Sequence, residues 1–294
     1  EDAWLVARSA VQQSPGDLAW RERLARVAEW TQRGPVALEN WLVIARRTQK
    51  DEAWQTVLRL APGLFDDEAL IEGLRYELRR QPHNPQLVRE LVLAYERIGT
   101  PQPAIDFLIQ QPATPANLEL LAELASRAED LDLALKSWEQ LFKDPEQLTP
   151  DRAMRASVQA LLRGRAALGM SWLEAARKRV TESTADAADF WRMTGQLAEK
   201  QRRDATALEA YRALLATDQA DMGDFDTLSR LLKTDHPAQA ADVDLLAWDR
   251  FGEPRHLVSA LTFLVSRSQW PAVKSQLQRL NPDPQASRYA LQPL

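Results

Sequence analysis

Large and small residues alternate at a fixed spacing between residues 191 and 211. Gly195 and Ala207 lie twelve positions apart, Trp191 lies four before the glycine, and Tyr211 lies four after the alanine. Residues four apart share one face of a helix. The pattern therefore predicts two helices, joined at the polar segment QRRD, that fold back on each other. The small residues allow a close crossing, and the large residues fill the volume beside it.

The same frame recurs along the chain at steps of 30 to 33 residues, with two larger gaps of 67 and 73 that are close to double steps. Two further copies are expected in these gaps. Repetition at this period is typical of stacked supersecondary units. The residue pairs that occupy this frame are Ala25 and Ala37, Val92 and Ala104, Ala122 and Ala134, Gly195 and Ala207, Leu228 and Ala240, and Ala260 and Ala272, with the added copies at Val57 and Ala69 and at Ser157 and Gly169.

The expected fold is all-α, a superhelical solenoid of stacked antiparallel helical hairpins that occupies residues 1–294 as one domain. Proline and asparagine mark the expected helix ends in QPHNP, QPATP, LTPD and LNPDP. No sustained two-residue alternation predicts strands. We expect roughly seven full repeats plus partial repeats at both ends. Residues 1–15 match the second helix of a truncated repeat, and residues 283–294 match the start of a further one, so the chain is expected to be a fragment of a longer protein.

The hairpin from Ala188 to Gln219 resembles a tetratricopeptide repeat. It matches that family's pattern at Trp191, Gly195, Ala207 and Tyr211, whereas Thr194 and Ala198 depart from the usual leucine and tyrosine. The resemblance implies an array of hairpins whose first helices line a binding groove.

A narrower resemblance concerns the tryptophan-rich hairpins that also contain many Arg, Glu and Gln residues. Segments such as LARVAEWTQRGPVALENWL and DLDLALKSWEQLF resemble the periplasmic repeat region of the PelB family, the outer-membrane exporters of the Pel biofilm exopolysaccharide. This resemblance implies a periplasmic scaffold that recruits a polysaccharide deacetylase or hydrolase and guides polymer to the exporter. It further implies a cationic, partly deacetylated polymer as a second ligand and an outer-membrane β-barrel on the same longer chain. The alternative is a general adaptor that binds a peptide or helix of a partner protein.

Composition and motifs give no indication of catalysis or of a cofactor. The chain has no cysteine, so thiol chemistry and CxxC metal sites are excluded. His83, His236 and His256 fall in different repeats and match no metal-ligand spacing, and no phosphate-binding loop or nucleophile elbow occurs. No apolar run is long enough to span a bilayer. A net charge of -5 and a pI of about 5.4 argue against a nucleic acid ligand. We therefore predict a protein that is not an enzyme.

By the resemblance, groove-facing positions are expected on the first helices. Trp30 is of particular interest because it lies near the end of its helix, whereas Trp41, Trp138 and Trp191 are predicted to be core residues. The candidate partner-binding residues are Trp30, Arg89, Arg97, Glu123, Arg127, Arg192, Gln196, Lys200, Phe225, Lys233, Leu257 and Leu261.

Two features near the C-terminus allow two interpretations each. The apolar residues Phe225, Leu257 and Leu261 are either a docking strip or core residues that a shift of register has placed in the groove. The segment from Asp218 to Glu253 contains nine acidic residues and three basic ones. They either cap helices and lie on solvated surfaces or guide a cationic partner.

Overall fold

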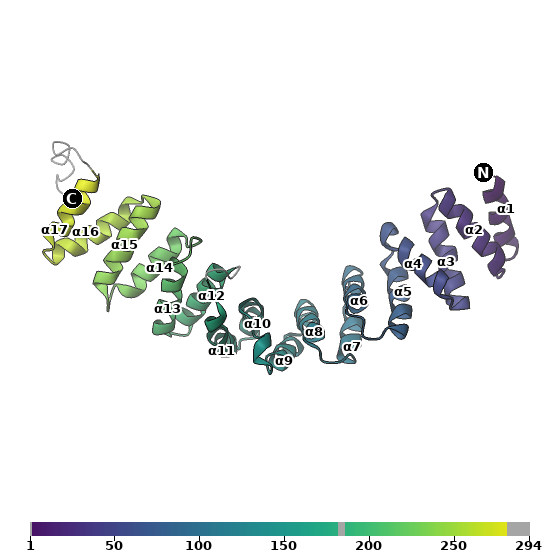
Figure 1. The fold of residues 1–294 in the computed structure, drawn as a ribbon, viewed down its shortest axis with the longest axis horizontal. Helices are drawn as coiled ribbons and strands as arrows, with labels where there is room; N and C mark the ends of the chain where they lie inside the picture. The colour runs from purple at the N-terminus through teal and green to yellow at the C-terminus, as the bar shows by residue number, and fades with distance from the viewer. Residues whose placement is uncertain (1, 182–185, 281–294) are drawn as a thin grey trace. The chain divides into compact units, whose positions relative to one another are not determined.

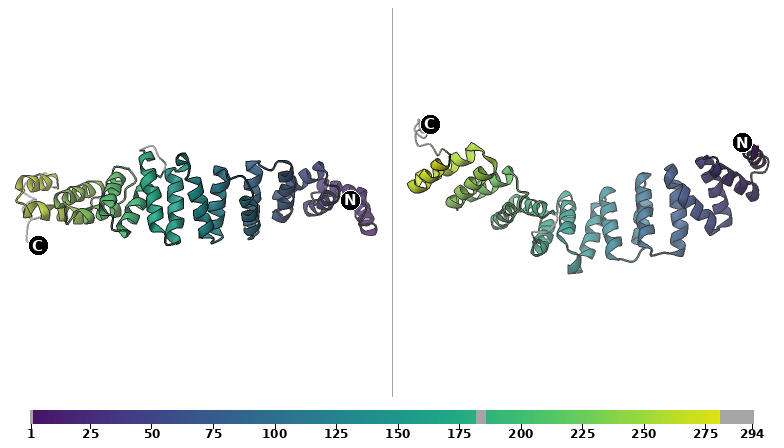
Figure 2. Two further views of the ribbon diagram at one scale, coloured as in Figure 1. Left: turned by 90° about the horizontal axis from the view of Figure 1, so that it is seen from below. Right: turned by 45° about the horizontal axis from the view of Figure 1, so that its top comes forward.

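The computed structural model describes residues 2–181 and 186–280. Contacts divide the chain into two compact units, residues 1–144 and residues 145–294. Both units consist of helices, and no strand occurs in the described ranges. In Figures 1 and 2 the helices within each unit follow one another as neighbouring antiparallel pairs. The predicted all-α fold of stacked hairpins is confirmed.

The first unit has one leading helix followed by four hairpins. The leading helix, α1 (Asp2–Gln13), packs against α2. The hairpins are α2 (Leu18–Trp30) with α3 (Gly34–Thr48), α4 (Asp51–Leu60) with α5 (Asp67–Arg80), α6 (Pro85–Arg97) with α7 (Gln102–Ile109), and α8 (Pro115–Arg127) with α9 (Leu131–Leu141). A short 3-10 turn, η1 (Pro62–Leu64), lies between α4 and α5.

The second unit also has four hairpins in its described part. They are α10 (Pro150–Leu162) with α11 (Ala166–Ala176), α12 (Ala187–Lys200) with α13 (Asp204–Leu215), α14 (Met222–Leu232) with α15 (Pro237–Phe251), and α16 (Pro254–Ser266) with α17 (Trp270–Leu280). Two 3-10 turns, η2 (Pro145–Gln147) and η3 (Arg177–Arg179), flank α10 and α11. The described residues thus form eight hairpins where the sequence predicted roughly seven. The repeat predicted at 283–294 lies outside the described residues.

Helix starts follow the polar and proline signals in the sequence. The side chains of Asp17, Asn84 and Thr149 each accept a hydrogen bond from a backbone amide in the first turn of α2, α6 and α10. Pro85 and Pro150 occupy the first helical position, where the missing N–H costs nothing. These short-range signals fix where the hairpins that start with α2, α6 and α10 begin.

The small-residue frame lies at the helix crossings, as predicted. Its members are buried in every copy, including the two copies placed in the gaps of the sequence pattern, except that Ala272 is half-buried. A Cβ atom added to Gly169 would lie 3.2 Å from the Cα of Ser157, and one added to Gly195 would lie 2.7 Å from the ring of Tyr211. The second helix therefore packs against the first with no room for another methyl group at either glycine. Trp41 and Trp138 are buried as expected, and Trp191 is half-buried.

The crossing in the α12–α13 hairpin gives a stability prediction. We expect Gly195→Ala to lower the free energy of unfolding by up to about 2 kcal/mol, because overpacking costs about 1–3 kcal/mol and improved helix propensity offsets about 1 kcal/mol of it. Urea denaturation followed by circular dichroism measures this change. The control is Gly63→Ala, where nothing lies within 4 Å of the added Cβ and the change should stay within about 0.5 kcal/mol. A gain of about 1 kcal/mol in Gly195→Ala, as expected from helix propensity alone, would contradict the close crossing.

Candidate functional site

A three-residue polar brace joins successive first helices in both units. In the first unit, Trp41 Nε1 of α3 donates a 2.7 Å hydrogen bond to Glu29 of α2, and Glu29 also pairs with Arg59 of α4. In the second unit, Tyr211 of α13 donates to Glu199 of α12 at 3.0 Å, and Glu199 pairs with Arg230 of α14. Burial, together with the hydrogen bond to Glu199, raises the pKa of Tyr211. Polar residues near the ends of the first helices are therefore part of the repeat-to-repeat contact.

Three arginines predicted to bind a partner are already paired within the chain. Arg97 binds Asp67 through two nitrogen atoms, at 2.6 and 2.9 Å from one carboxylate oxygen. Arg127 binds Glu96, and Arg192 binds Asp224 at 2.8 Å. These hydrogen bonds to carboxylates raise the pKa of Arg97 and Arg192. The three guanidinium groups link neighbouring helices, so each would exchange an intramolecular ion pair to bind a partner, and their role in partner binding stays a prediction.

Other predicted site residues do face solvent. Trp30 has 81% of its surface exposed, although it is a tryptophan in an otherwise well-packed hairpin. Four polar residues are exposed and form no hydrogen bond or ion pair with any other described residue: Arg89, Gln196, Lys200 and Lys233. Glu123 is half-buried. We call these exposed side chains of the first helices the first-helix faces.

The apolar end of the predicted groove is core. Phe225 is 3% exposed and meets the ring of Phe251 edge-on, with ring centres 5.5 Å apart. Leu257 is 6% exposed, and Leu261 is half-buried. Their assignment to a partner-binding surface is corrected for Phe225 and Leu257, because the helices of the neighbouring hairpins cover them. Of the two interpretations, the one that places them in the core is observed.

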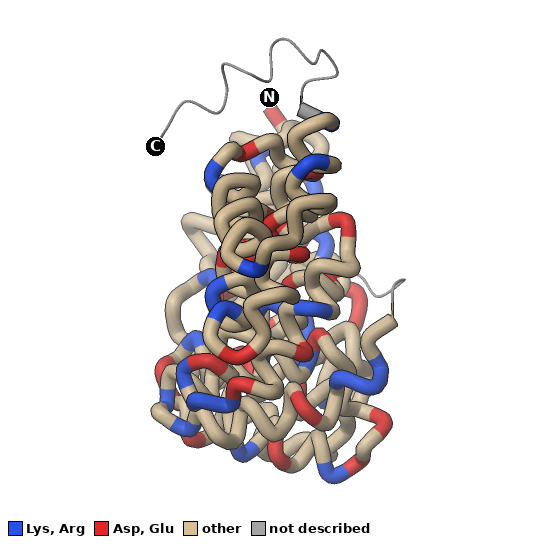
Figure 3. Tube along the Cα trace, turned by 90° about the vertical axis from the view of Figure 1, so that its left-hand side faces the viewer, with Lys and Arg blue, Asp and Glu red and all other residues tan. Residues whose placement is uncertain are grey.

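Many acidic residues of the C-terminal stretch have structural partners. Asp221 and Asp224 form a reciprocal capping box at the start of α14. Asp226 pairs with Arg255, and Asp249 pairs with Arg279. Acidic and basic positions are interspersed along the trace in Figure 3. These pairs favour the capping and surface interpretation of the acidic stretch.

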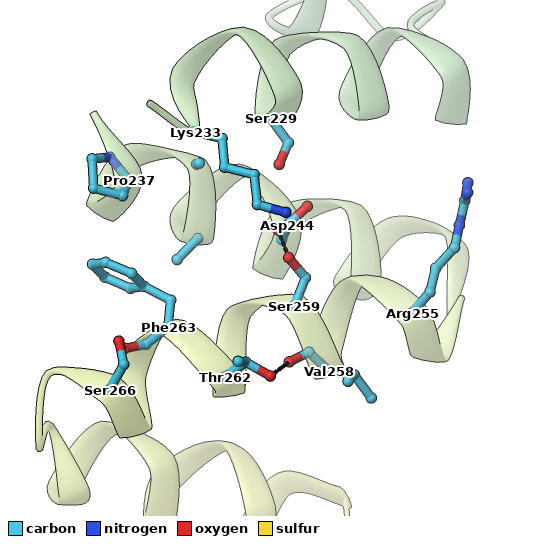
Figure 4. Close-up of a pocket in the computed structure, with 12 residues that line it drawn as sticks. Ser229, Lys233, Pro237, Asp244, Arg255, Val258, Ser259, Thr262, Phe263 and Ser266 are labelled. Carbon is cyan, nitrogen blue, oxygen red and sulfur yellow. Dashed lines mark hydrogen bonds between the residues drawn. The ribbon is translucent and has the colours of Figure 1, made fainter. Parts of the chain in front are cut away.

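A polar pocket of about 560 Å³ lies between α14, α15 and α16. In Figure 4 the Lys233 side chain extends from α14 toward Asp244 of α15 and Ser259 of α16, and Phe263 forms part of the wall. Lys233, a predicted partner-binding residue, lines this pocket together with Ser229. The lining residues are Ser229, Lys233, Pro237, Ala240, Ala241, Asp244, Arg255, Val258, Ser259, Thr262, Phe263 and Ser266.

A buried polar network lies beside this pocket. One oxygen of Asp244 accepts a 2.6 Å hydrogen bond from the Ser259 hydroxyl, and the other lies 3.2 Å from Nδ1 of His256. His256 is 3% exposed, and its Nε2 lies 3.5 Å from Asp226. The carboxylate lies between the hydroxyl and the imidazole, whereas activation of a nucleophile needs the base beside the hydroxyl. The network joins three helices, as expected of a structural histidine.

Sequence reasoning missed two features. Asp244 occupies the position of Trp41, Leu108, Trp138 and Tyr211 in other copies, so its polar network was visible only as a departure from the frame. On α10, Val158, Leu161 and Leu162 are exposed at the positions that Gln196, Glu199 and Lys200 hold on α12. Numbering from Ser157 would have placed Val158 and Leu162 on a first-helix face.

Neither a metal site nor a membrane span is found in the described part of the chain. No cluster of three or more His, Asp or Glu side chains is arranged to hold a metal ion there. None of the helices in the same ranges combines the length and apolar character needed to cross a bilayer.

Comparison with known proteins identifies the repeat. The tetratricopeptide repeat family model matches residues 140–291. The chain belongs to the tetratricopeptide repeat family. A search of curated proteins finds no match. Among solved structures, the complex of Naa15 and Naa10 bound to HypK-THB has a TM-score of 0.57 and 15% identity, and the match covers 92% of this chain and 45% of that one. At this identity the likeness shows the fold alone.

Two further structures match with lower scores. One is the C-terminal part of a tetratricopeptide repeat protein from Cytophaga hutchinsonii, with a TM-score of 0.46, 14% identity, and coverage of 82% of this chain and 100% of that one. The other is MamA from Desulfovibrio magneticus RS-1, with a TM-score of 0.42, 18% identity, and coverage of 57% and 94%. Tetratricopeptide repeats are typically non-catalytic scaffolds for protein interaction.

The buried network gives a prediction about this repeat. We expect Asp244→Leu to lower the free energy of unfolding by about 1–3 kcal/mol, although leucine is found at the same position in another copy, because His256 and Ser259 lose their buried acceptor. Replacing all three residues, as Asp244→Leu, His256→Leu and Ser259→Ala, should restore most of that loss, because no polar group is then left unpaired. Urea denaturation measures both variants. A single variant as stable as the unmodified chain would show that the network does not stabilise the repeat.

Proposed function

We propose that this tetratricopeptide repeat chain is a periplasmic scaffold in the export of a Pel-type biofilm exopolysaccharide, where it recruits the polysaccharide-modifying deacetylase or hydrolase and guides polymer to the outer-membrane exporter. The observation that supports a scaffold is the series of exposed first-helix faces, with Trp30, Arg89, Gln196, Lys200 and Lys233 unpaired or solvent-facing. The Pel-type assignment is supported by the resemblance of the tryptophan-rich hairpins to the PelB repeat region.

The direct ligand in this proposal is the protein partner. A cationic polymer would need a surplus of available carboxylates, whereas Asp224, Asp226 and Asp249 are each bound to an arginine. The remaining polar groups on the first-helix faces are of mixed charge, which suits a folded partner with complementary charges. Holding the modifying enzyme on the exporter chain raises its effective concentration at the polymer, so transfer between the two becomes local.

The alternative function is an adaptor that binds a peptide or helix of a partner outside polysaccharide export. The same first-helix faces are equally compatible with it. The two functions differ in the partner and in the compartment, and binding to the modifying enzyme separates them.

Isothermal titration calorimetry tests the proposal. The chain is titrated with the periplasmic deacetylase of a Pel-type system and, separately, with a partly deacetylated oligosaccharide at two salt concentrations. We expect saturable binding to the enzyme and weak or no binding to the sugar. Lys200→Glu on α12 should weaken enzyme binding by about tenfold if that face is the contact, whereas Lys274→Glu, an exposed lysine on the second helix α17, should leave it unchanged.

The other outcomes change the assignment. Salt-sensitive sugar binding without enzyme binding would make the array a polymer guide. Absence of both would remove the export function and leave the adaptor.

A further inference from the structure

A second pocket lies in the first unit, between α4, α5 and α6. It has a volume of about 340 Å³. Five leucines make up most of its wall, and Leu93, at its edge, is 41% exposed. The lining residues are Leu58, Pro62, Leu70, Leu74, Leu87, Glu90, Leu93 and Arg97.

This leucine pocket occupies the same place in its repeat as the polar pocket of the second unit. Counted from the frame residues Val57 and Leu228, the first helix contributes the position one residue later, and the segment just after it contributes the position five residues later. These are Leu58 and Pro62 in one pocket and Ser229 and Lys233 in the other. The next first helix contributes positions five and two residues before its own small residue: Leu87 and Glu90, or Arg255 and Val258. The repeat geometry therefore generates a pocket at this position, and the side chains decide its chemistry.

We propose that the leucine pocket binds an aliphatic side chain of a partner protein that has a lysine or arginine next to it in its sequence. The proposal rests on the scaffold part of the proposed function and is independent of polysaccharide export. No hydroxyl or amide side chain lines the pocket. Because five of the eight lining residues are leucines, most hydroxyl groups of a sugar placed there would lose hydrogen bonds to water without replacement, whereas an aliphatic side chain gains burial of its apolar surface.

Charge at the pocket mouth selects the neighbouring residue of the ligand. The guanidinium of Arg97 is bound to both oxygens of Asp67, so this pair is neutral as a whole. Glu90 is exposed and has no hydrogen bond or ion pair with any other described residue. Arg89, the residue before Glu90 on α6, does not line the pocket. The mouth thus presents one unpaired carboxylate, which favours a basic residue beside the aliphatic anchor.

The absence of a side chain at Gly73 leaves room for Leu58 in the wall of the pocket. It lies in the middle of α5 at the position that Trp41 and Trp138 occupy in their repeats, and a Cβ atom there would lie 2.8 Å from Cδ2 of Leu58. Leu58 lines the pocket. An added methyl group at residue 73 therefore displaces Leu58 toward the pocket space, while alanine improves the helix propensity of α5.

A display library of random twelve-residue peptides is the probe. We expect panning on the whole chain to enrich peptides with a Leu, Ile or Met next to a Lys or Arg, and the enriched peptides are then measured by calorimetry. Leu93→Gln and Gly73→Ala should each weaken binding by about tenfold or more. Ile109→Gln is the matched control, because Ile109 is an exposed aliphatic residue of α7 outside the pocket, and it should leave affinity unchanged.

A further pair of variants tests the role of charge at the pocket mouth. Glu90→Lys should weaken binding of the same peptides several-fold, whereas Glu68→Lys, at an exposed glutamate of the second helix α5 outside the pocket, should not. Thermal melts of all variants check folding, and Leu93→Gln tests the pocket even if Gly73→Ala proves unstable.

Several outcomes would overturn the proposal. They are failure to enrich any peptide, enrichment of peptides without an aliphatic residue, and equal binding to the unmodified chain and to Leu93→Gln. Titration with the deacetylase is a separate measurement. If the peptides bind the pocket and the deacetylase does not bind the chain, the pocket remains and the export function fails. If the deacetylase binds and the peptides do not, the pocket proposal fails and the scaffold remains.

Discussion

The close crossing of two helices at small residues is the constraint on which the rest of the structure depends. At Gly169 and Gly195 an added methyl group would meet the backbone of Ser157 or the ring of Tyr211. Because the helices approach so closely, large side chains such as Trp138 must fill the space one turn away, where they are fully buried. Each hairpin then has defined outer faces, and stacking the next hairpin on one of them covers apolar surface that a single repeat leaves exposed.

Stacked hairpins must also be held in register, and polar residues contribute to this. Glu29 and Glu199 each accept a hydrogen bond from an aromatic side chain of their own hairpin. Each also forms an ion pair with an arginine of the next first helix. Ion pairs of this exposed kind add at most about 1 kcal/mol each to the free energy of unfolding. Their main effect is therefore on the register of successive hairpins and on which arginine side chains are already paired. An arginine that binds a neighbouring repeat must exchange that ion pair before it can bind a ligand. The unpaired side chains and the pockets between repeats need no such exchange.

The pockets show how one backbone geometry can support different ligands. The same positions are leucine and proline in the first unit and serine and lysine in the second. A repeat can change these side chains without disturbing the helix crossing, because the crossing uses other positions. These positions can therefore vary between repeats while the crossing residues remain, which allows the ligand of a scaffold to change while the fold remains.

The sequence by itself determined the hairpins, their boundaries and the all-α class. These depend on local spacing, since residues four apart share a helix face and a short turn forces the second helix back onto the first. Even the weak copies at Val57 and Ser157 could be placed, because the period of the array is nearly constant. The exposure of Trp30 also followed from its position at the end of a first helix.

Only the tertiary structure decided which groove residues are available. Arg97, Arg127 and Arg192 find their carboxylates 30 to 32 positions away, in a neighbouring helix or repeat. Phe225 and Leu257 are covered by adjacent hairpins, and Asp244 is buried because His256 and Ser259 approach it from the next repeat. These contacts depend on the angle and offset between successive hairpins. Residue spacing fixes the frame within a hairpin, whereas burial and pairing between hairpins follow from how they pack.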